Sequence, residues 1–315
     1  MTSMKVDIDN FVRAETSFQF DRVLAASGDV NRWYHVRGPV PIDRQNVIRM
    51  QRDTLYSSVV VDVSRGATLS LPDTEGRYRS VAVINEDHYT NDLLHEAGTY
   101  ELTVDRSDTP YAYLIMRILA DPNNPEDLET VHQLQDSTLL EAESAAPYSH
   151  PDYDEDSYKQ LYANILALGE AKPDAIGSFG PKDKVNPVRH LIDTALGWGG
   201  LPEHEAHYMG DSGPRPVGRY SLSLRDAPAD AFWSLSIYNR NGFFEKNPAE
   251  SYNMNSVVAE PNPDGSFTLN LAPEKGELTN YLYVMDGWNY VFRLYHPRPE
   301  VFDGTWHLPE FIPTE

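Results

Sequence analysis

Apolar and polar residues alternate along two stretches of the chain. Between residues 33 and 119 the period is two in several short runs, and Leu55 and Val61 fall on one face of the first run. The same period returns after Gly218 and continues in short runs to residue 295. Because side chains alternate between the two faces of a β-strand, both stretches are predicted to form sheets. Gly and Pro separate the runs at intervals typical of a sandwich or jelly roll.

A helical period marks other segments of the chain. Two of these segments begin with an asparagine followed by a proline, at Asn124-Pro125 and at Asn186-Pro187. Asparagine is a favoured N-cap, and proline is favoured in the first turn because an N–H needs no helical partner there. The predicted helices cover residues 8–26, 125–140, 156–169 and 187–197.

Together these patterns predict a mainly β protein with helices, of the α+β class. It would contain two antiparallel modules, each resembling a β-sandwich or jelly roll, linked by a helical segment. The predicted domains are residues 1–140, a helical linking segment at 141–200, and residues 201–315. The acidic stretch 141–157, rich in Ala, Ser, Pro and Asp, is interpreted as the linker.

Charge and composition exclude several classes of function. The formal net charge of -22 opposes binding to nucleic acid or to an anionic membrane surface. The absence of cysteine excludes disulfides, thiol nucleophiles and Cys-ligated metal centres. Residues 1–10 are polar, and no apolar run has the length of a membrane span, so we expect a cytoplasmic protein.

Several short segments carry a family resemblance. The run from Arg49 through Gln51, Asp53 and Tyr56 to Ser57, the run from Ile84 to Thr90, and the run from Ala120 to Asp127 resemble the domain of unknown function 1254. The runs Gly197-Trp198-Gly199-Gly200, Ile237 to Phe244, and Leu294 to Trp306 are similar to its usual companion, the domain of unknown function 1214.

The resemblance implies a jelly-roll-like N-terminal sandwich, a second β-rich domain and a homo-oligomer. It implies no particular chemistry. The chain departs from the family pattern at Gln51, where relatives commonly have Asn, and at Arg240, where they commonly have Asp.

Asp53, Glu86 and His88 are the candidate catalytic residues. Strand alternation predicts that Asp53 faces the core, and that Glu86 and His88 share an inward face with Ile84. With Cα atoms about 6.5–7 Å apart, Glu86 and His88 could act on one substrate or share one metal. Such a set suits general acid–base chemistry or a divalent metal held by N and O atoms. The structural alternative is a hydrogen-bonded network that closes the rim of the sandwich, with Arg52 pairing an acid.

Six further residues are predicted to bind substrate, namely Arg49, Arg52, Tyr56, Tyr89, Tyr238 and Asn239. The two arginines could hold an anionic group. Tyr238 and Asn239 lie where a strand enters the turn at Gly242, and side chains at such places either bind a ligand or complete the turn.

A serine in the second half has a misleading context. Asp211-Ser212-Gly213-Pro214 is similar to the nucleophile segment of chymotrypsin-like proteases. A catalytic serine needs a base and an oxyanion hole, and no matching histidine context accompanies this one. We therefore predict that Ser212 is not a nucleophile and that it lies in a loop before a strand.

The leading hypothesis is an enzyme that hydrolyses an ester or phosphoester of a small polar substrate, in a cleft at the mouth of the N-terminal sandwich. A divalent metal would suit the candidate residues, and the sequence leaves the cofactor open. A nucleotide cofactor is not expected, because the chain lacks a phosphate-binding glycine loop and a dinucleotide fingerprint. The alternatives are a protein that binds a carbohydrate-like ligand without catalysis and an assembly module. The expected partners are a small-molecule ligand and further copies of the chain.

Overall fold

The computed structural model describes residues 3–45, 48–169, 171–172 and 174–315, with the side chain of Ser212 outside the description. Its contacts divide the chain into two compact units. Unit 1 comprises Met1–Arg37, Leu55–Ala120 and Asn124–Glu203, and unit 2 comprises Gly38–Thr54, Asp121–Asn123 and His204–Glu315. Residues 38–54, which carry Arg49, Arg52 and Asp53, therefore belong with the C-terminal residues.

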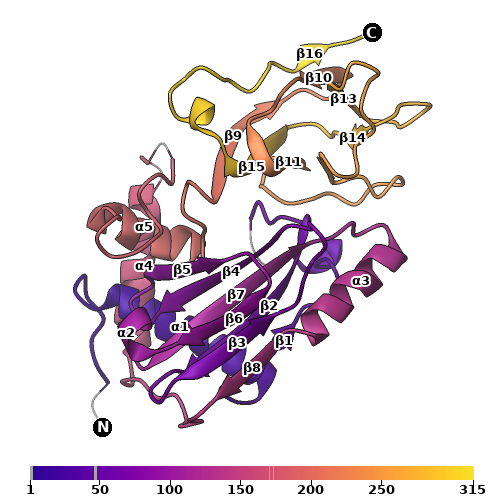
Figure 1. Cartoon of the computed structure of the whole chain (residues 1–315). Helices are drawn as coiled ribbons and strands as arrows, with labels where there is room; N and C mark the ends of the chain where they lie inside the picture. The colour runs from indigo at the N-terminus through magenta and orange to yellow at the C-terminus, as the bar shows by residue number, and fades with distance from the viewer. Residues whose placement is uncertain (1–2, 46–47, 170, 173) are drawn as a thin grey trace. The chain divides into compact units, whose positions relative to one another are not determined.

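Unit 1 contains a β-sandwich (Figure 1). One sheet has the order β1-β2-β7-β4-β5 and the other has the order β6-β3-β8. In chain order these strands are β1 (Tyr34–His35), β2 (Thr54–Asp62), β3 (Ala67–Leu71), β4 (Arg79–Asn85), β5 (Thr90–Leu94), β6 (Gly98–Leu102), β7 (Tyr111–Leu119) and β8 (Leu139–Ala142). The pairings of β4 with β5 and β7, and of β3 with β6 and β8, are antiparallel.

Alternating apolar side chains of the two sheets meet in the sandwich core. Val81 and Val83 of β4 pack there in one cluster with Leu69 of β3. Each such side chain contributes about 1.5–3 kcal/mol when fully buried. The opposite face of β4, which carries Ile84, is also buried. The inward face predicted for Glu86 and His88 is therefore not the face that forms the sandwich core.

The helices of unit 1 are α1 (Phe11–Ser27), α2 (Val104–Ser107), α3 (Pro125–Asp136), α4 (Glu155–Gly169) and α5 (Pro187–Gly197). Asn124 caps α3 by accepting hydrogen bonds from the N–H groups of Glu126 and Asp127, and Asn186 caps α5 in the same way. The predicted helix 125–140 is too long. From Leu139 onward the chain pairs with β3 as strand β8, which completes the smaller sheet.

The stretch 141–157 differs from the expected linker. It lies within unit 1, as does the whole predicted linking segment 141–200. Tyr153 is buried in an apolar cluster with Phe11 of α1, Ile165 of α4 and Ile192 of α5. An acidic, proline-containing composition therefore does not mark a boundary here, because its aromatic residue anchors the stretch to the helices.

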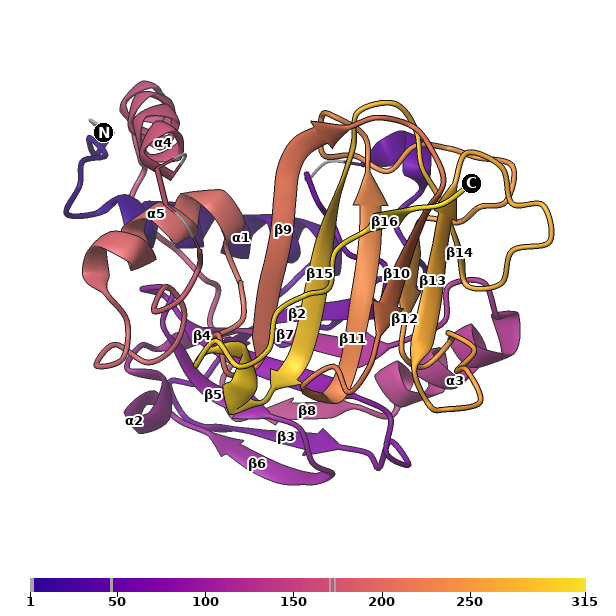
Figure 2. The same ribbon diagram turned by 90° about the horizontal axis from the view of Figure 1, so that it is seen from above.

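Unit 2 contains two four-stranded sheets, with the orders β12-β11-β15-β9 and β14-β13-β10-β16 (Figure 2). The strands are β9 (Ala206–Arg215), β10 (Tyr220–Leu224), β11 (Ala229–Tyr238), β12 (Asn253–Asn255), β13 (Phe267–Ala272), β14 (Tyr281–Tyr283), β15 (Trp288–Pro297) and β16 (Ile312–Pro313). Two short 3-10 helices, Ile42–Arg44 and Pro299–Val301, also belong to this unit. Trp233, Leu235 and Phe292 of the first sheet share a core with Leu222 and Leu269 of the second.

The predicted fold class is confirmed. The protein is mainly β with helices, and its strands form several largely antiparallel sheets. The pairing of β13 with β14 is parallel. Residues 211–214, expected in a loop, lie instead in β9 and pair with β15, and the prediction about the Ser212 hydroxyl falls on a side chain outside the description.

Candidate functional site

Gln51 sets the conformation of the chain just before β2. Its Oε1 accepts hydrogen bonds from the backbone N–H groups of Asp53 (2.6 Å) and Thr54 (2.8 Å). Its Nε2 donates to the Thr54 hydroxyl at 2.6 Å. The bend that results holds Asp53, whose side chain has no exposed surface.

The Asp53 carboxyl group is satisfied on one side only. Its Oδ1 accepts hydrogen bonds from Nδ2 of Asn253 (2.8 Å) and Nδ2 of Asn255 (3.1 Å). These two asparagines are two residues apart on β12, so their side chains point to the same face. The other oxygen, Oδ2, is buried, and none of the described residues donates a hydrogen bond to it. Buried polar groups nearly always have a partner, so this atom requires an explanation.

The face of unit 2 that holds Asp53 is polar because of alternation in β11. In the run from Ser234 to Tyr238, Leu235 and Ile237 enter the apolar core, so Ser234, Ser236 and Tyr238 point to the opposite face. Ser234 pairs with Asn255 of β12 on one side and with Arg293 of β15 on the other. Residues directly opposite each other in a sheet have Cβ atoms about 4.5–5.5 Å apart, so these side chains are neighbours. The Ser234 hydroxyl is buried without a described partner.

Arg293, which is 3% exposed, is the buried cation of this face. Its Nη1 donates to Ser236 Oγ (3.0 Å), and its Nη2 donates to the Arg49 carbonyl (2.7 Å) and the Tyr238 hydroxyl (3.0 Å). Burial lowers the pKa of the Arg293 guanidinium. Tyr238, Tyr295 and Asp53 raise this pKa by more, so the net shift is upward. Arg293 therefore keeps its charge and gives the face a fixed positive group.

Tyr238 and Arg52 hold the segment 49–53 against the same face. The Tyr238 hydroxyl donates to the Met50 carbonyl at 2.7 Å. Arg52 lies 5.1 Å from the centre of the Tyr252 ring and donates from Nη1 to the Val40 carbonyl at 2.9 Å. Burial lowers the pKa of Arg52, and its Nε is buried with no described acceptor. At this face one acceptor (Asp53 Oδ2), one donor (Arg52 Nε) and one group able to do both (Ser234 Oγ) thus have no partner among the described residues.

Arg49 and Asn239 mainly build turns. Asn239 Oδ1 accepts from the N–H groups of Asn241 (3.0 Å) and Phe243 (3.2 Å), which closes the turn after β11. Arg49 has a left-handed backbone (φ 51°), and its N–H donates to the Gly242 carbonyl at 2.7 Å. Of the two roles considered for Asn239, these contacts show the structural one.

Glu86 and His88 lie in unit 1 and in a turn rather than on a strand. Strand β4 ends at Asn85, whose Oδ1 accepts from the N–H groups of Asp87 (2.9 Å) and Tyr89 (3.0 Å). His88 is left-handed, with φ 63°. Strand alternation therefore cannot be extended to residues 86–89, and the prediction of a shared strand face for Glu86 and His88 is wrong.

Glu86 joins this turn to the first helix. Its Oε2 lies 2.7 Å from Nη1 of Arg13, and Nε of the same arginine lies 2.7 Å from Asp87. Its Oε1 accepts from the N–H of Tyr111 at 3.2 Å. Burial raises the pKa of Glu86, while Arg13 opposes that shift.

Both ring nitrogens of His88 are committed to hydrogen bonds within unit 1. Nδ1 lies 2.8 Å from the Thr194 hydroxyl, which itself donates to the His190 carbonyl, so Nδ1 carries the proton. Nε2 accepts from the N–H of Gly199 at 2.8 Å. The ring stacks on Trp198 at 5.0 Å between ring centres. Burial and the neighbouring His190 hold the pKa of His88 well below its ordinary value of 6.5, so the ring is neutral.

Tyr56 and Tyr89, the remaining predicted residues, also make contacts in unit 1. The Tyr89 ring stacks on His190 at 4.6 Å between ring centres. The Arg117 guanidinium lies 5.1 Å from the centre of the Tyr56 ring.

The structure thus brings together part of the predicted set. Arg49, Arg52, Asp53, Tyr238 and Asn239 lie around one sheet of unit 2, whereas Tyr56, Glu86, His88 and Tyr89 belong to unit 1. Sequence reasoning missed Asn253, Asn255, Ser234 and Arg293. A signal existed for them, because Asn and Ser recur at every second position of short runs, which predicts a polar strand face.

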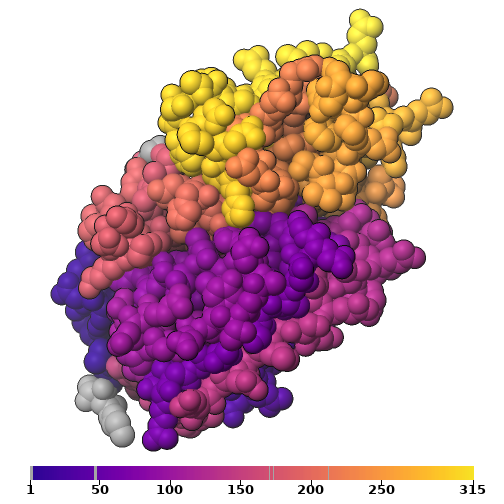
Figure 3. All heavy atoms as spheres, in the orientation of Figure 1, coloured from indigo at the N-terminus to yellow at the C-terminus, as the bar shows by residue number. Residues whose placement is uncertain are grey.

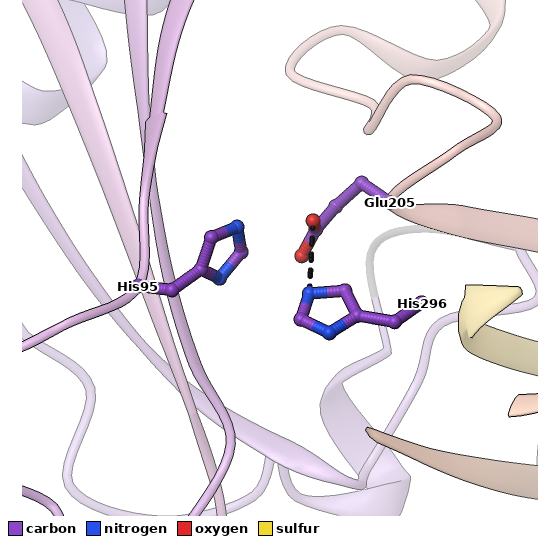
Figure 4. Close-up of side chains that lie close together, drawn as sticks. All are labelled: His95, Glu205 and His296. Carbon is purple, nitrogen blue, oxygen red and sulfur yellow. Dashed lines mark ion pairs between the residues drawn. The ribbon is translucent and has the colours of Figure 1, made fainter. Parts of the chain in front are cut away.

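Unit 2 also contains a second buried carboxylate. Oε2 of Glu205 forms an ion pair with Nε2 of His296 at 3.2 Å (Figure 4). The backbone N–H of His296 donates to the Glu205 carbonyl at 2.9 Å. This pair joins the start of β9 to the end of β15.

Comparison with known proteins identifies the family. Residues 30–99 match the model described as protein of unknown function DUF1254, and residues 212–299 match the one described as protein of unknown function DUF1214. The chain belongs to the DUF1254/DUF1214 family. The Asp53 network draws on both matched regions, because Asp53 lies in the DUF1254 match and Asn253, Asn255, Ser234 and Arg293 lie in the DUF1214 match.

Solved structures agree with the fold of this DUF1254/DUF1214 protein. A crystal structure of a protein from Vibrio parahaemolyticus matches it with a TM-score of 0.76 at 17% identity, covering 97% of both chains. An uncharacterized protein from Burkholderia cenocepacia matches with a TM-score of 0.53 at 12% identity, covering 96% of this chain and 85% of that one. Identities this low show the fold alone. None of the curated proteins matches the chain. Among the described residues, no helix is both long and apolar enough to cross a membrane.

Proposed function

We propose that unit 2 binds a small polyhydroxylated, carbohydrate-like molecule through Asp53. The observation that carries the proposal is the half-satisfied carboxyl group, in which Oδ1 accepts two amide hydrogen bonds and the buried Oδ2 accepts none from the described residues. A buried polar atom without a partner costs about 1–3 kcal/mol. A ligand hydroxyl that donates to Oδ2 would recover this free energy on binding.

The neighbouring groups favour a polyol over a simple cation. Arg52 Nε can only donate, whereas the Ser234 hydroxyl can donate or accept. A cation would satisfy Asp53 but would be repelled by Arg52 and by the buried Arg293. A polyol carries hydroxyls on adjacent carbons, each able to donate and to accept, and adds no charge. Tyr252, which stacks with Arg52, contributes the aromatic surface common in sugar-binding sites.

The contacts of Glu86 and His88 do not support an acid–base role. Both nitrogens of His88 have partners in the fold, and Glu86 is paired with Arg13. Their proton-transfer capacity is therefore committed to holding unit 1 together. Ester or phosphoester hydrolysis stays a prediction from the sequence, and binding is the function that the geometry supports best.

Binding at Asp53 requires local opening. Asp53 has no exposed surface, while Arg52 and Asn253 beside it are partly exposed. A ligand that enters only when such neighbours move apart associates slowly. We therefore expect association to be slower than diffusion to an open site would allow, because binding requires a conformational change.

The substitution Asp53→Asn tests the proposal, because it keeps the shape and the Oδ1 acceptor but replaces Oδ2 with a donor. We expect calorimetric titration with glucose, myo-inositol or glycerol to detect binding to the wild type, and at least about tenfold weaker binding to Asp53→Asn. A charge-assisted hydrogen bond contributes about 1.5–3 kcal/mol, and about 1.4 kcal/mol corresponds to a factor of ten.

Asp62→Asn is the matched control. Asp62 is also wholly buried, but Oδ1 accepts from the N–H of Ser64 at 3.0 Å and Oδ2 accepts from the N–H of Ala146 at 2.8 Å. This variant should lose stability and keep the affinity of the wild type. Equal affinities in Asp53→Asn and the wild type would contradict the proposal, as would a wild type that binds none of the three polyols at about 10 mM.

A further inference from the structure

Unit 2 also contains a hollow that is built around Arg215. Its volume is about 300 Å³, and it is lined by Arg215, Tyr220, Tyr290, Leu308, Pro309, Glu310 and Phe311. A water molecule occupies about 30 Å³ of liquid, so the hollow has room for a molecule of about ten non-hydrogen atoms. Residues 308–311, which form one wall, belong to the C-terminal segment, which is yellow at the surface of unit 2 in Figure 3.

A bulge between β9 and β15 directs Arg215 into the hollow. Trp288 pairs with Arg215 and Tyr290 pairs with Asp211, so the register shifts between these two pairs. Such bulges bend a strand and re-aim a side chain. Gly213 lies within this irregular stretch, where its N–H donates to Oδ1 of Asp211 at 2.8 Å and a Cβ would lie 3.0 Å from the same oxygen. The segment that resembles a protease nucleophile motif thus serves to position an arginine.

Arg215 is held rigidly but is not fully paired. Its guanidinium lies 5.3 Å from the ring centre of Trp288, 4.9 Å from that of Tyr290 and 5.4 Å from that of Phe311. Its Nη2 forms an ion pair with Asp211 at 2.9 Å. Its Nη1 is buried, and no described residue accepts a hydrogen bond from it. A guanidinium fixed by aromatic rings with a spare N–H group is preorganised to bind a carboxylate.

One backbone carbonyl holds Tyr220, which lines the hollow, and Trp288, whose ring packs on Arg215. The Pro216 carbonyl accepts hydrogen bonds from the Tyr220 hydroxyl (2.9 Å) and from Trp288 Nε1 (3.1 Å). The C-terminal segment crosses the sheet toward β10, where Pro313 pairs with Tyr220 (Figure 2). The hollow is therefore formed by the fold itself rather than by free side chains.

We propose that this hollow binds a free α-amino acid with an apolar side chain. The carboxylate would pair with the guanidinium of Arg215, which lines the hollow, and would reach the buried Nη1 after a small local movement. The ammonium group would pair with Glu310, which also lines the hollow and is exposed. The side chain would pack against Leu308 and the tyrosine rings. A zwitterion also suits a chain of net charge -22, because it brings no net negative charge to the protein.

Three probes separate the contributions of the two charged groups. L-leucine carries both groups, 4-methylpentanoate lacks the ammonium group, and 3-methylbutylamine lacks the carboxylate. Calorimetric titration of the full chain should give the highest affinity for L-leucine and at least about tenfold weaker binding of each of the other two.

Variants assign these contributions to residues. Glu310→Gln, at an exposed position, should weaken L-leucine binding about tenfold and leave 4-methylpentanoate binding unchanged. Arg215→Lys keeps the charge but loses the planar fork, and it should weaken both ligands. Arg225→Gln, which removes an exposed arginine paired with Asp264, is the control and should change neither affinity. Asp53→Asn should also leave L-leucine binding unchanged, so this site and the proposed polyol site can fail separately.

Two results would overturn the proposal. One is the absence of L-leucine binding by the wild type at about 10 mM, measured in the same titrations. The other is a Glu310→Gln variant that binds L-leucine as tightly as the wild type does, because the ammonium group would then have no partner in the hollow.

Discussion

The His88 ring joins the turn after β4 to Thr194 of α5 and to Gly199. A histidine two positions after a glutamate predicts acid–base chemistry, but that prediction depended on a strand continuing past Asn85. The Asn85 side chain instead caps a turn, and His88 adopts a left-handed backbone. An Asn side chain can form such hydrogen bonds with backbone groups two to four residues away in several backbone conformations. The Asn in the sequence therefore did not by itself predict this turn. Asp53 was expected to face the same core as Leu55. It is buried, but it lies just before β2, and its carboxyl group bonds to Asn253 and Asn255 of unit 2 instead.

The substitution His88→Gln should weaken the fold of unit 1 and change its response to pH. Gln can accept from Gly199 but loses the bond to Thr194, so we expect a loss of about 1–3 kcal/mol at pH 8 in chemical denaturation. The lowered pKa of His88 means that the folded chain binds fewer protons at this ring than the unfolded chain does below about pH 6.5. The neutral His88 ring therefore stabilises the folded chain fully above about pH 6.5, and this stabilisation is lost as the pH falls below that value.

The pH test is the difference between wild type and His88→Gln, measured by denaturation from pH 8 to pH 5. Glu86 titrates with the opposite sign, because burial raises its pKa, but it is common to both proteins and cancels in the difference. The stability gap should narrow as the pH falls below 6.5. A gap that stays constant over this range would mean that His88 is not held neutral.

At the scale of elements, helices and strands followed their sequence signals more closely than the connections did. The Asn-Pro pairs correctly predicted where α3 and α5 begin, and the alternating apolar runs correctly predicted β2 and β4. The loop after α5 carried no such signal, although its Gly199 bonds to two side chains of unit 1. Gly199 donates its N–H to His88 and accepts from Arg117 Nη2 at 2.6 Å. When a loop packs closely against a sheet, the only sign of the contact in the sequence is a glycine. Many glycines have no such role, so the contact cannot be predicted from the glycine alone.

Gly199→Ala should destabilise unit 1 strongly. The residue has φ 74°, and a Cβ there would lie 2.6 Å from Cδ1 of Ile115. A left-handed non-glycine backbone costs about 1–3 kcal/mol, and overpacking adds a similar amount. Gly197→Ala is the matched control two residues earlier, because a Cβ there meets nothing within 4 Å. We expect its free energy of unfolding to stay within about 1 kcal/mol of the wild type. Similar losses in both variants, measured in urea, would contradict the close approach.

At the scale of the whole molecule, the division into units was the hardest feature to predict. Asp53 bonds to asparagines 200 and 202 positions later in the chain. No local pattern signals a contact at such a separation, whereas burial and alternation are local properties. Residues 38–54 therefore looked like part of the N-terminal module although they pack in unit 2.

The homo-oligomer implied by the family resemblance stays a prediction at this scale. Light scattering during gel filtration at micromolar concentration should give a multiple of the chain mass of 35.6 kDa, that of a dimer or of a ring of dimers. A mass of one chain across that range would contradict the expectation.

The unpaired oxygen of Asp53 is the centre of the functional account, and a crystal structure of the protein soaked with the polyol that binds best in titration tests it most directly. We predict a ligand hydroxyl about 2.7 Å from Asp53 Oδ2, with the two asparagine bonds to Oδ1 retained. Density for the polyol elsewhere, with Oδ2 bonded only to groups of the protein, would contradict the account.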